Sequence, residues 1–400
     1  MSDVLSITDL SMKNKKVLMR VDFNVPLNDK QEVTDETRIV SSLPSIKYVL
    51  DHGGSLILMS HLGRPKGEKK PEFSLKPVAA KLSILLDHPI IMAPDCIGPE
   101  VERLAASLRP GQVLMLENLR FYNAEEKPES DPSFAKKLSK LGDIYINDAF
   151  GTAHRAHSST AVIAKYFPQK AAAGFLMQKE IDSIGKTLFS PKRPFLAIIG
   201  GAKISSKVGV IKSLLAKADT LLIGGGMAYT FFKAQGFAIG NSIHEDEMLN
   251  EARSILDSVK DHKNKLHLPT DVIAADAMNE TAKTVTVNPS KGIPKGFEGV
   301  DIGPSTIRDF VAALQTATTV LWNGPLGVFE IPKFSAGTRA IAEAIGRLKA
   351  TTIVGGGDSI AALQQMGLAS TVTHLSTGGG ATLEYIEFGT LPGIEALSKK

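Results

Sequence analysis

The chain has 400 residues, of which 43% are hydrophobic and 22% charged, and its formal net charge is +4. This length fits two domains, each large enough to bury its own core. The mild charge disfavours a nucleic-acid-binding protein, whose binding domain is strongly basic. Apolar runs stay far below the ~20 residues that cross a bilayer, and the N-terminal region lacks the apolar stretch of a signal peptide. Cys96 is the only cysteine, so no intrachain disulfide can form. We therefore expect a cytoplasmic protein without nucleic-acid or membrane partners.

Short apolar runs alternate with helical patterns along the chain. The predicted strands of the first half are 16–21, 55–59, 113–116 and 143–146, and those of the second half are 195–199, 220–223, 319–322, 351–354 and 372–375. Alternating strands and helices predict parallel sheets, and continuous apolar runs indicate strands covered on both faces. The expected fold class is α/β, with two lobes that are each a parallel-sheet, Rossmann-like sandwich.

The helix expected after the first strand has clear end signals. Thr34 is a suitable N-cap, with Asp35 and Glu36 in the first turn. Apolar residues then recur at helical spacing from Ile39 to Leu50, and Gly53 and Gly54 end the helix.

The boundary between the halves is expected near residues 168–174. Beyond it, Met177, Ile181, Ile184 and Leu188 form one helical stripe. This pattern predicts a helix and hinge that connect domain 1–172 to domain 173–387.

Polar residues follow the strands of the first half, where open α/β sheets bind ligands. Arg64, Arg120 and Arg155 each come after a different strand. A single arginine there is usually a solvated loop charge, but three at one topological position indicate an anion pocket, because the guanidinium fork matches carboxylate and phosphate. Asp22 and Asn24, after the first strand, suit a hydroxyl-bearing ligand.

Arg38 is a second indication of an anion-binding site. It falls in the first turn of the predicted helix, where the helix dipole disfavours a cation by roughly 0.3–1 kcal/mol. An exposed Arg38 paired with Asp35 or Glu36 is by itself a plausible explanation of this position. A bound anion is the alternative.

The strands of the second half end in glycines. Four such turns precede helical patterns, and together they predict a nucleotide or another polyphosphate, since glycine lets backbone amides approach phosphate oxygens. The turns are Gly200-Gly201, Gly224 to Gly226, Gly355 to Gly357 and Gly378 to Gly380.

Three charged side chains accompany these turns. Lys203 and Lys207 are expected one helical turn apart at a helix N-terminus, which is unfavourable without an anionic ligand. Asp358 begins the helix after the third turn. It fits a first-turn acid and a ligand that holds Mg²⁺ on nucleotide phosphates equally well.

Several familiar signatures are absent from the sequence. It contains no phosphate-binding loop ending in Gly-Lys-Ser/Thr after a strand, no protein-kinase motif and no dinucleotide-binding glycine fingerprint.

Seven motifs, in order along the chain, resemble those of the phosphoglycerate kinase family. They are Arg20 to Pro26, Ser60 to Pro65, Glu117 to Phe121, Asp148 to Arg155, Trp322 to Pro325, Gly355 to Ser359 and Ser376 to Ala381. The resemblance implies reversible phosphoryl transfer between 1,3-bisphosphoglycerate and Mg-ADP in glycolysis, by a monomer whose lobes close about a hinge. It also implies that the tail, about 388–400, returns to the first domain.

The resemblance further implies a role for each site residue. Phosphoglycerate would be held on the first domain by Asp22, Phe23, Asn24, Arg38, His61, Leu62, Gly63, Arg64, Arg120 and Arg155. The nucleotide would be held on the second by Gly201, Lys203, Lys207, Gly225, Asn323, Pro325, Glu330, Gly356, Gly357, Asp358 and Ser359. Asp358 would hold Mg²⁺ through the nucleotide phosphates. Arg38, Lys203 and the amides of Gly356 and Gly379 would surround the transferring group.

Two other functions are weighed against this one. A kinase for a small acid such as acetate would leave the arginine cluster without a second anionic group to bind. A non-catalytic binding protein would have no need of Arg38, Lys203 and Asp358 together.

Overall fold

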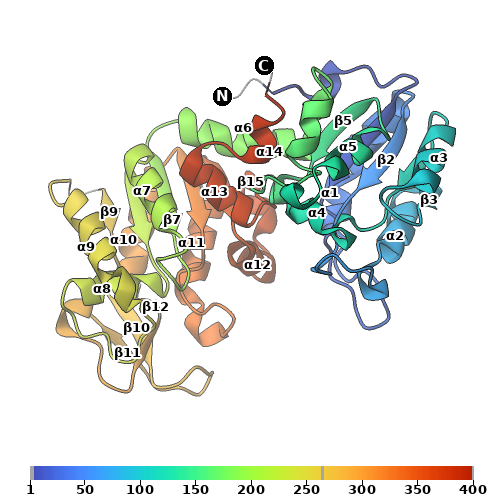
Figure 1. Cartoon of the computed structure of the whole chain (residues 1–400). Coiled ribbons are helices and arrows are strands. Elements are labelled where there is room, and N and C mark those ends of the chain that lie inside the picture. The colour runs from blue at the N-terminus through green and yellow to red at the C-terminus, as the bar shows by residue number, and fades with distance from the viewer. Residues whose placement is uncertain (1–3, 263–264, 399–400) are drawn as a thin grey trace. The chain divides into compact units, whose positions relative to one another are not determined.

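The computed structural model describes residues 4–262 and 265–398. The chain divides into two compact units, residues 1–182 with 390–400, and residues 183–389. Among the described residues each unit contains one six-stranded sheet in which all neighbouring strands are parallel (Figure 1). This confirms the predicted fold of two parallel-sheet α/β lobes.

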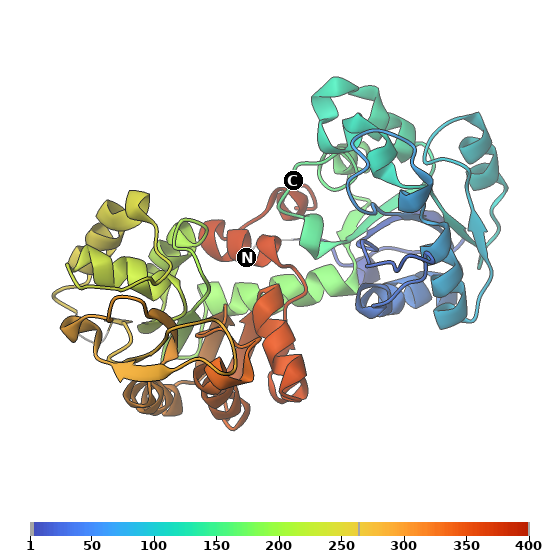
Figure 2. The same ribbon diagram turned by 90° about the horizontal axis from the view of Figure 1, so that it is seen from below.

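The sheet of the first unit has the order β3-β4-β2-β1-β5-β6. Its strands are β1 (Lys16–Val21), β2 (Ser55–Met59), β3 (Ile90–Met92), β4 (Val113–Met115), β5 (Ile144–Asp148) and β6 (Ala171–Ala173). The α-helices of this unit are α1 (Thr37–Asp51), α2 (Lys76–Leu86), α3 (Pro99–Ser107), α4 (Asn123–Glu126), α5 (Ser133–Ser139) and α14 (Pro392–Glu395). Helix α6 (Phe175–Phe189), green in Figure 2, begins in the first unit and ends in the second.

The parallel sheet of the second unit has the order β15-β14-β13-β7-β8-β9. Its strands are β7 (Phe195–Ile199), β8 (Thr220–Ile223), β9 (Leu266–His267), β13 (Thr319–Asn323), β14 (Thr351–Gly355) and β15 (His374–Leu375). The helices are α7 (Val208–Lys217), α8 (Met227–Ala234), α9 (Leu249–Ser258), α10 (Pro304–Gln315), α11 (Ala336–Gly346), α12 (Gly357–Gln365) and α13 (Gly380–Phe388).

A second, antiparallel sheet in this unit was not predicted. It consists of β10 (Val272–Ala275), β11 (Thr284–Val287) and β12 (Glu298–Ile302), in the order β11-β10-β12. Strand β12 packs closely against α8. A Cβ atom placed on Gly299 of β12 would stand 2.0 Å from the ring of Tyr229 in α8. The sequence did not predict this sheet, because most of β11 is exposed and its apolar pattern is weak.

Each parallel sheet lies in a hydrophobic core, as the continuous apolar runs predicted. All five residues of β2, β5, β7 and β13 are buried. In the second unit the core includes Trp322, which is fully buried in β13. None of the helices in the described part of the chain is long and apolar enough to cross a membrane.

Two helix predictions are wrong in detail. Helix α1 begins at Thr37 rather than after Thr34; Asp35 accepts a hydrogen bond from the Thr37 amide at 2.9 Å, and Thr34 contacts Pro26 instead. Helix α7 begins only at Val208, so Lys203 and Lys207 do not share a helical face. In both cases a hydrogen-bonded turn occupies the residues that were expected to form the first turn.

The strand orders place a topological switch point in each unit. In the first unit β1 lies between β2 and β5, and in the second β7 lies between β8 and β13. Ligands of open α/β sheets bind at such points, outside the carboxyl ends of the strands. The residues that follow these strands are therefore the candidate site.

Candidate functional site

In the first unit, hydrogen bonds hold the turns after β1, β2 and β4 together. Asn24 Oδ1 accepts from the Gly63 amide at 2.8 Å, and Gly63 O accepts from Arg120 Nη1 at 2.8 Å. Gly63 has φ +59°, and a Cβ atom there would lie 2.4 Å from the Phe73 ring, so only glycine fits this turn. The polar residues predicted after different strands thus lie next to each other.

Two predicted substrate residues have side chains in the core. Phe23 and Leu62 are 0% and 3% exposed and belong to the hydrophobic cluster of the first unit. Only their main-chain groups could reach a ligand. The Phe23 amide is occupied by Ser60 Oγ at 2.9 Å.

The predicted arginines have different environments. Arg38 Nη1 donates to Asp22 Oδ2 at 2.6 Å, so the acid that pairs with Arg38 is Asp22 rather than Asp35 or Glu36. Arg120 is half-buried, pairs with Glu126 at 3.1 Å and has a buried Nε without a hydrogen-bond partner. Arg64 and Arg155 are exposed and form no ion pair among the described residues. Several positive charges at this edge of the sheet are therefore available to an anion.

Burial and nearby arginines lower the pKa values of two histidines, His61 and His157. Burial and nearby arginines hold the pKa of His61 well below its usual range. Burial and the positive charges of nearby arginines lower the pKa of His157 to about 3. The arginines that act on one or both are Arg20, Arg38, Arg120 and Arg155. Arg20 contacts His61 Nδ1 at 3.1 Å, and Arg38 pairs with Asp22, whose Oδ1 is 3.9 Å from the same nitrogen, so these two cations lie beside His61.

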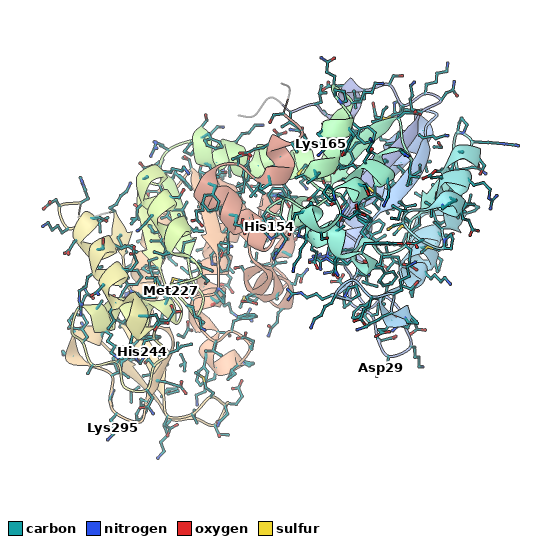
Figure 3. All side chains as sticks on the ribbon, in the orientation of Figure 1. Asp29, His154, Lys165, Met227, His244 and Lys295 are labelled. Carbon is teal, nitrogen blue, oxygen red and sulfur yellow. The ribbon has the colours of Figure 1, made fainter. Side chains whose placement is uncertain are left out.

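Sequence reasoning missed Arg20 and His157 as residues of this region. Arg20 lies within β1 and is only 1% exposed. A charged residue inside an otherwise apolar strand was the available signal, because buried arginines occur almost only where they are paired. The segment after β5 that contains His154 (Figure 3) also contributes His157.

In the second unit, the glycine turns after β7, β8 and β13 contact each other. The Gly201 amide donates to Pro325 O at 2.9 Å. Gly200 has no room for a side chain, since a Cβ atom would stand 2.1 Å from Pro325 O, and one on Gly225 would stand 2.6 Å from the Gly201 nitrogen. Close approach of three turns is the reason for glycine here.

Lys207 connects two of these turns. Its Nζ donates to Gly200 O at 2.8 Å and to Asn323 Oδ1 at 2.7 Å. Burial lowers the pKa of Lys207 to about 8, and Asp358 opposes that shift. Asn323 is itself buried, and its Nδ2 has no hydrogen-bond partner. Lys203 is exposed instead.

A cavity of about 350 Å³ lies beside these turns. Five predicted nucleotide residues line it, namely Gly201, Gly225, Pro325, Glu330 and Asp358. Its apolar wall includes Tyr229, Ile243, Met278 and Leu326, none of which was predicted from the sequence. Two of them, Ile243 and Met278, lie in loops away from the strand ends. An apolar wall beside glycine turns suits a nucleotide, whose base is flat and whose phosphates are anionic.

The N-termini of α12 and α13 complete the predicted set. Gly356 and Gly379 are their N-cap residues, with φ +91° and +54°, and the first amides of a helix have no acceptor within the helix. Asp358 lies in the first turn of α12, and Ser359 Oγ accepts from the Gly324 amide at 2.6 Å. Gly357 faces open space, because nothing lies within 4 Å of a Cβ atom there.

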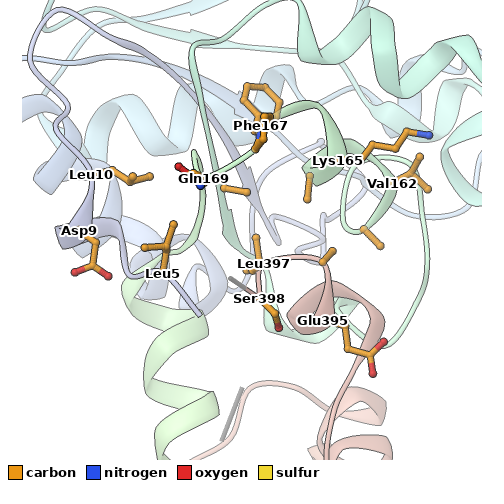
Figure 4. A pocket seen from close by; sticks show the side chains of 15 residues that line it. Leu5, Asp9, Leu10, Val162, Lys165, Phe167, Gln169, Glu395, Leu397 and Ser398 are labelled. Atoms are coloured by element: carbon orange, nitrogen blue, oxygen red, sulfur yellow. The ribbon is translucent and has the colours of Figure 1, made fainter. Parts of the chain in front are cut away.

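A larger cavity of about 900 Å³ lies elsewhere in the first unit (Figure 4). It is formed by the N-terminal segment, residues 161–171 and the C-terminal segment, with Leu5, Phe167 and Leu397 among its lining residues. None of the predicted site residues lines it. The charges and the glycine turns, rather than cavity size, therefore mark the candidate site.

Comparison with known proteins identifies the family of the chain. Residues 7–388 match the family described as phosphoglycerate kinase. The cytosolic phosphoglycerate kinase of Triticum aestivum is 54% identical, with 98% of both chains covered, and the phosphoglycerate kinase of Moorella thermoacetica is 53% identical, with 99% of both covered. The solved structure of phosphoglycerate kinase from Coxiella burnetii superposes with a TM-score of 0.90 at 40% identity, with 98% of both chains covered. On sequence and fold, the chain belongs to the phosphoglycerate kinase family.

Proposed function

We propose that this protein catalyses reversible transfer of a phosphoryl group from 1,3-bisphosphoglycerate to Mg-ADP, giving 3-phosphoglycerate and ATP. The observation that carries the proposal is the division of the site: Arg20 and the Arg38–Asp22 pair lie beside His61 in the first unit, and the glycine turns line a cavity in the second. One unit is suited to a small polyanionic acid and the other to a nucleotide.

In this proposal the first unit binds the acid. Arg38, Arg64, Arg120 and Arg155 neutralise its carboxyl and phosphate groups, while Asp22 and Asn24 accept from its hydroxyl. His61 completes the contact, and Phe23, Leu62 and Gly63, whose amides already donate within the protein, shape the turns that hold these side chains.

The second unit binds the nucleotide. The amides of Gly201, Gly225, Gly356 and Gly357 approach the phosphates, with Asn323, Pro325 and Ser359 shaping the turns. Glu330 would accept from the ribose hydroxyls. Lys207 donates to Gly200 O and Asn323 Oδ1 and makes a longer contact, 3.5 Å, with Asn323 O, so a phosphate would take the place of that weakest contact.

Asp358, one of three carboxylates that line the cavity together with Glu298 and Glu330, fits Mg²⁺, which takes one or two protein carboxylates together with phosphate oxygens and water. When bound, the ion would neutralise charge on the nucleotide phosphates. Arg38, Lys203 and the amides of Gly356 and Gly379 would stabilise the charge of the transferring group. The reaction requires in-line positioning and no general base, because a carboxylate or phosphate oxygen is already a nucleophile.

Transfer requires the two ligands to meet, although their binding residues belong to different units. We therefore propose that the units close about a hinge at α6 and exclude water during the reaction. We also propose a monomeric enzyme of the cytoplasm that acts in glycolysis.

A coupled assay with 3-phosphoglycerate, ATP and Mg²⁺ tests this function. Wild-type protein should turn over, and Arg38→Ala should lose kcat by orders of magnitude with little change in nucleotide affinity. Equal activity with acetate would favour the other class of acid kinase. Absence of turnover despite binding of both substrates would favour a non-catalytic binding protein.

A further inference from the structure

Beneath the arginine cluster of the first unit lies a buried chain of hydrogen bonds. Arg20 in β1 donates through Nε to Ser159 Oγ at 2.8 Å, and through Nη2 it contacts His61 Nδ1 at 3.1 Å. Ser159 Oγ in turn contacts Glu125 Oε1 at 2.6 Å. All four side chains are at most 4% exposed. The chain therefore connects a buried carboxylate to a predicted substrate residue.

The direction of each hydrogen bond follows from chemistry. A guanidinium has only donors, so Ser159 Oγ and His61 Nδ1 must accept from Arg20. The Ser159 hydroxyl keeps its own proton and donates it to Glu125 Oε1. Burial raises the pKa of Glu125, and the Arg20 charge and the Ser159 hydrogen bonds oppose that rise and favour the carboxylate. The Ser159 amide also donates to Glu125 Oε2, at 3.1 Å, so the carboxylate is bound at both oxygens.

The acceptor role of Nδ1 determines the state of the His61 ring. An imidazolium has N–H groups at both nitrogens and cannot accept. The ring must therefore be neutral, with its proton on Nε2. An Nδ1–H group would set two donors against each other, and the alternative acceptor, Asp22 Oδ1, is 3.9 Å away. The low pKa of His61 agrees with this assignment.

The remaining nitrogen of the ring is available to a ligand. His61 Nε2 has no hydrogen bond with any described residue, and it is not among the buried polar atoms without a partner. It is therefore the accessible nitrogen. A neutral ring with Nε2–H can donate one hydrogen bond to an anion, whereas the other tautomer would present a lone pair and repel it.

We propose that the relay Glu125–Ser159–Arg20 is a positioning device that fixes His61 as its Nε2–H tautomer, so that His61 donates to the anionic acid. The proposal rests on the placement of His61 in the substrate site. Glu125 compensates the buried Arg20 charge and orients the guanidinium through Ser159. Neither Glu125 nor Ser159 need touch the substrate.

The tautomer can be measured without turnover. In full-length protein labelled with ¹⁵N-histidine, long-range ¹H–¹⁵N correlation spectra distinguish the two neutral tautomers and the imidazolium, and His61→Gln identifies the resonance. We expect the Nε2–H pattern from pH 6 to pH 8. An Nδ1–H or imidazolium pattern at pH 7 in the wild-type protein would overturn the proposal, with no variant required.

Two neighbouring serines offer a matched pair for the relay itself. Ser158 and Ser159 are both buried, but Ser158 Oγ donates to Ala124 O and has no contact with Arg20. Ser159→Ala should shift the His61 spectrum away from the pure Nε2–H pattern and raise KM for 3-phosphoglycerate about tenfold, with KM for ATP within about twofold. Ser158→Ala should change neither quantity. Identical His61 spectra in the two variants would show that Ser159 does not orient Arg20.

The two readouts separate this inference from the proposed function. An Nε2–H ring in a protein that does not turn over 3-phosphoglycerate would refute the proposed function and leave the relay intact. Normal turnover with the opposite tautomer would refute the relay alone.

Discussion

The charge of Lys207 should make nucleotide binding depend on pH. Burial brings its pKa to about 8, from an ordinary lysine value of 10.5, because its ammonium is enclosed between the turns after β7 and β13. At pH 7 about nine in ten folded molecules then carry the charge, and at pH 9 about one in ten. If only the ammonium attracts phosphate, Kd for Mg-ADP should weaken about tenfold between these pH values.

Titration calorimetry in two buffers of different ionisation enthalpy measures both the affinity and the protons taken up. The terminal phosphate loses its second proton near pH 6, so it contributes little above pH 7. We expect proton uptake on binding at pH 9 in the wild-type protein. Lys207→Met should bind more weakly and show no inflection near pH 8.

Lys212→Met is the matched control. Lys212 lies in α7 and pairs with Glu251 at 2.7 Å on the surface. This variant should keep the wild-type affinity and its pH dependence. A wild-type Kd that is flat from pH 7 to pH 9, or an equal slope in Lys207→Met, would refute the assignment of this charge to nucleotide binding.

Three further predictions follow from the same contacts. Burial raises the pKa of Asp301 to about 7; the folded state then holds a proton that the unfolded state releases, so stability should fall as pH rises from 4 to 7, by roughly 2–4 kcal/mol relative to Asp301→Asn. Urea unfolding followed by Trp322, the only tryptophan and a residue of the same unit, measures this, and parallel pH profiles would contradict it. Gly200→Ala should lower the free energy of unfolding of the second unit by about 1–3 kcal/mol, since its Cβ would stand 2.1 Å from Pro325 O. The control Gly357→Ala should change that free energy by less than about 0.5 kcal/mol. Equal free energies of unfolding in the two variants, followed by Trp322 fluorescence, would refute the steric reasoning. Small-angle scattering should show a smaller radius of gyration with both substrates bound, and an unchanged radius with binding confirmed independently would contradict closure.

The sequence alone was sufficient for the α/β class and for two lobes, and it predicted a kind of ligand for each lobe. These conclusions depend on local patterns. A buried parallel strand is a continuous apolar run, and the residues directly after it lie at the ligand-binding edge of the sheet whatever the details of the fold. Arg64, Arg120 and Gly201 were therefore identifiable from their positions after strands.

Only the tertiary structure decided what each charged side chain contacts. Lys207 was predicted to lie on a helical face beside Lys203, but its partner Asn323 is 116 residues away. Arg38 pairs with Asp22, a residue of another element, in place of its neighbours in the chain. Arg20 and Ser159 are separated by 139 residues. Helical and strand periodicity determine which face of an element is buried, whereas contacts between distant segments depend on how the elements pack, and no local pattern encodes that.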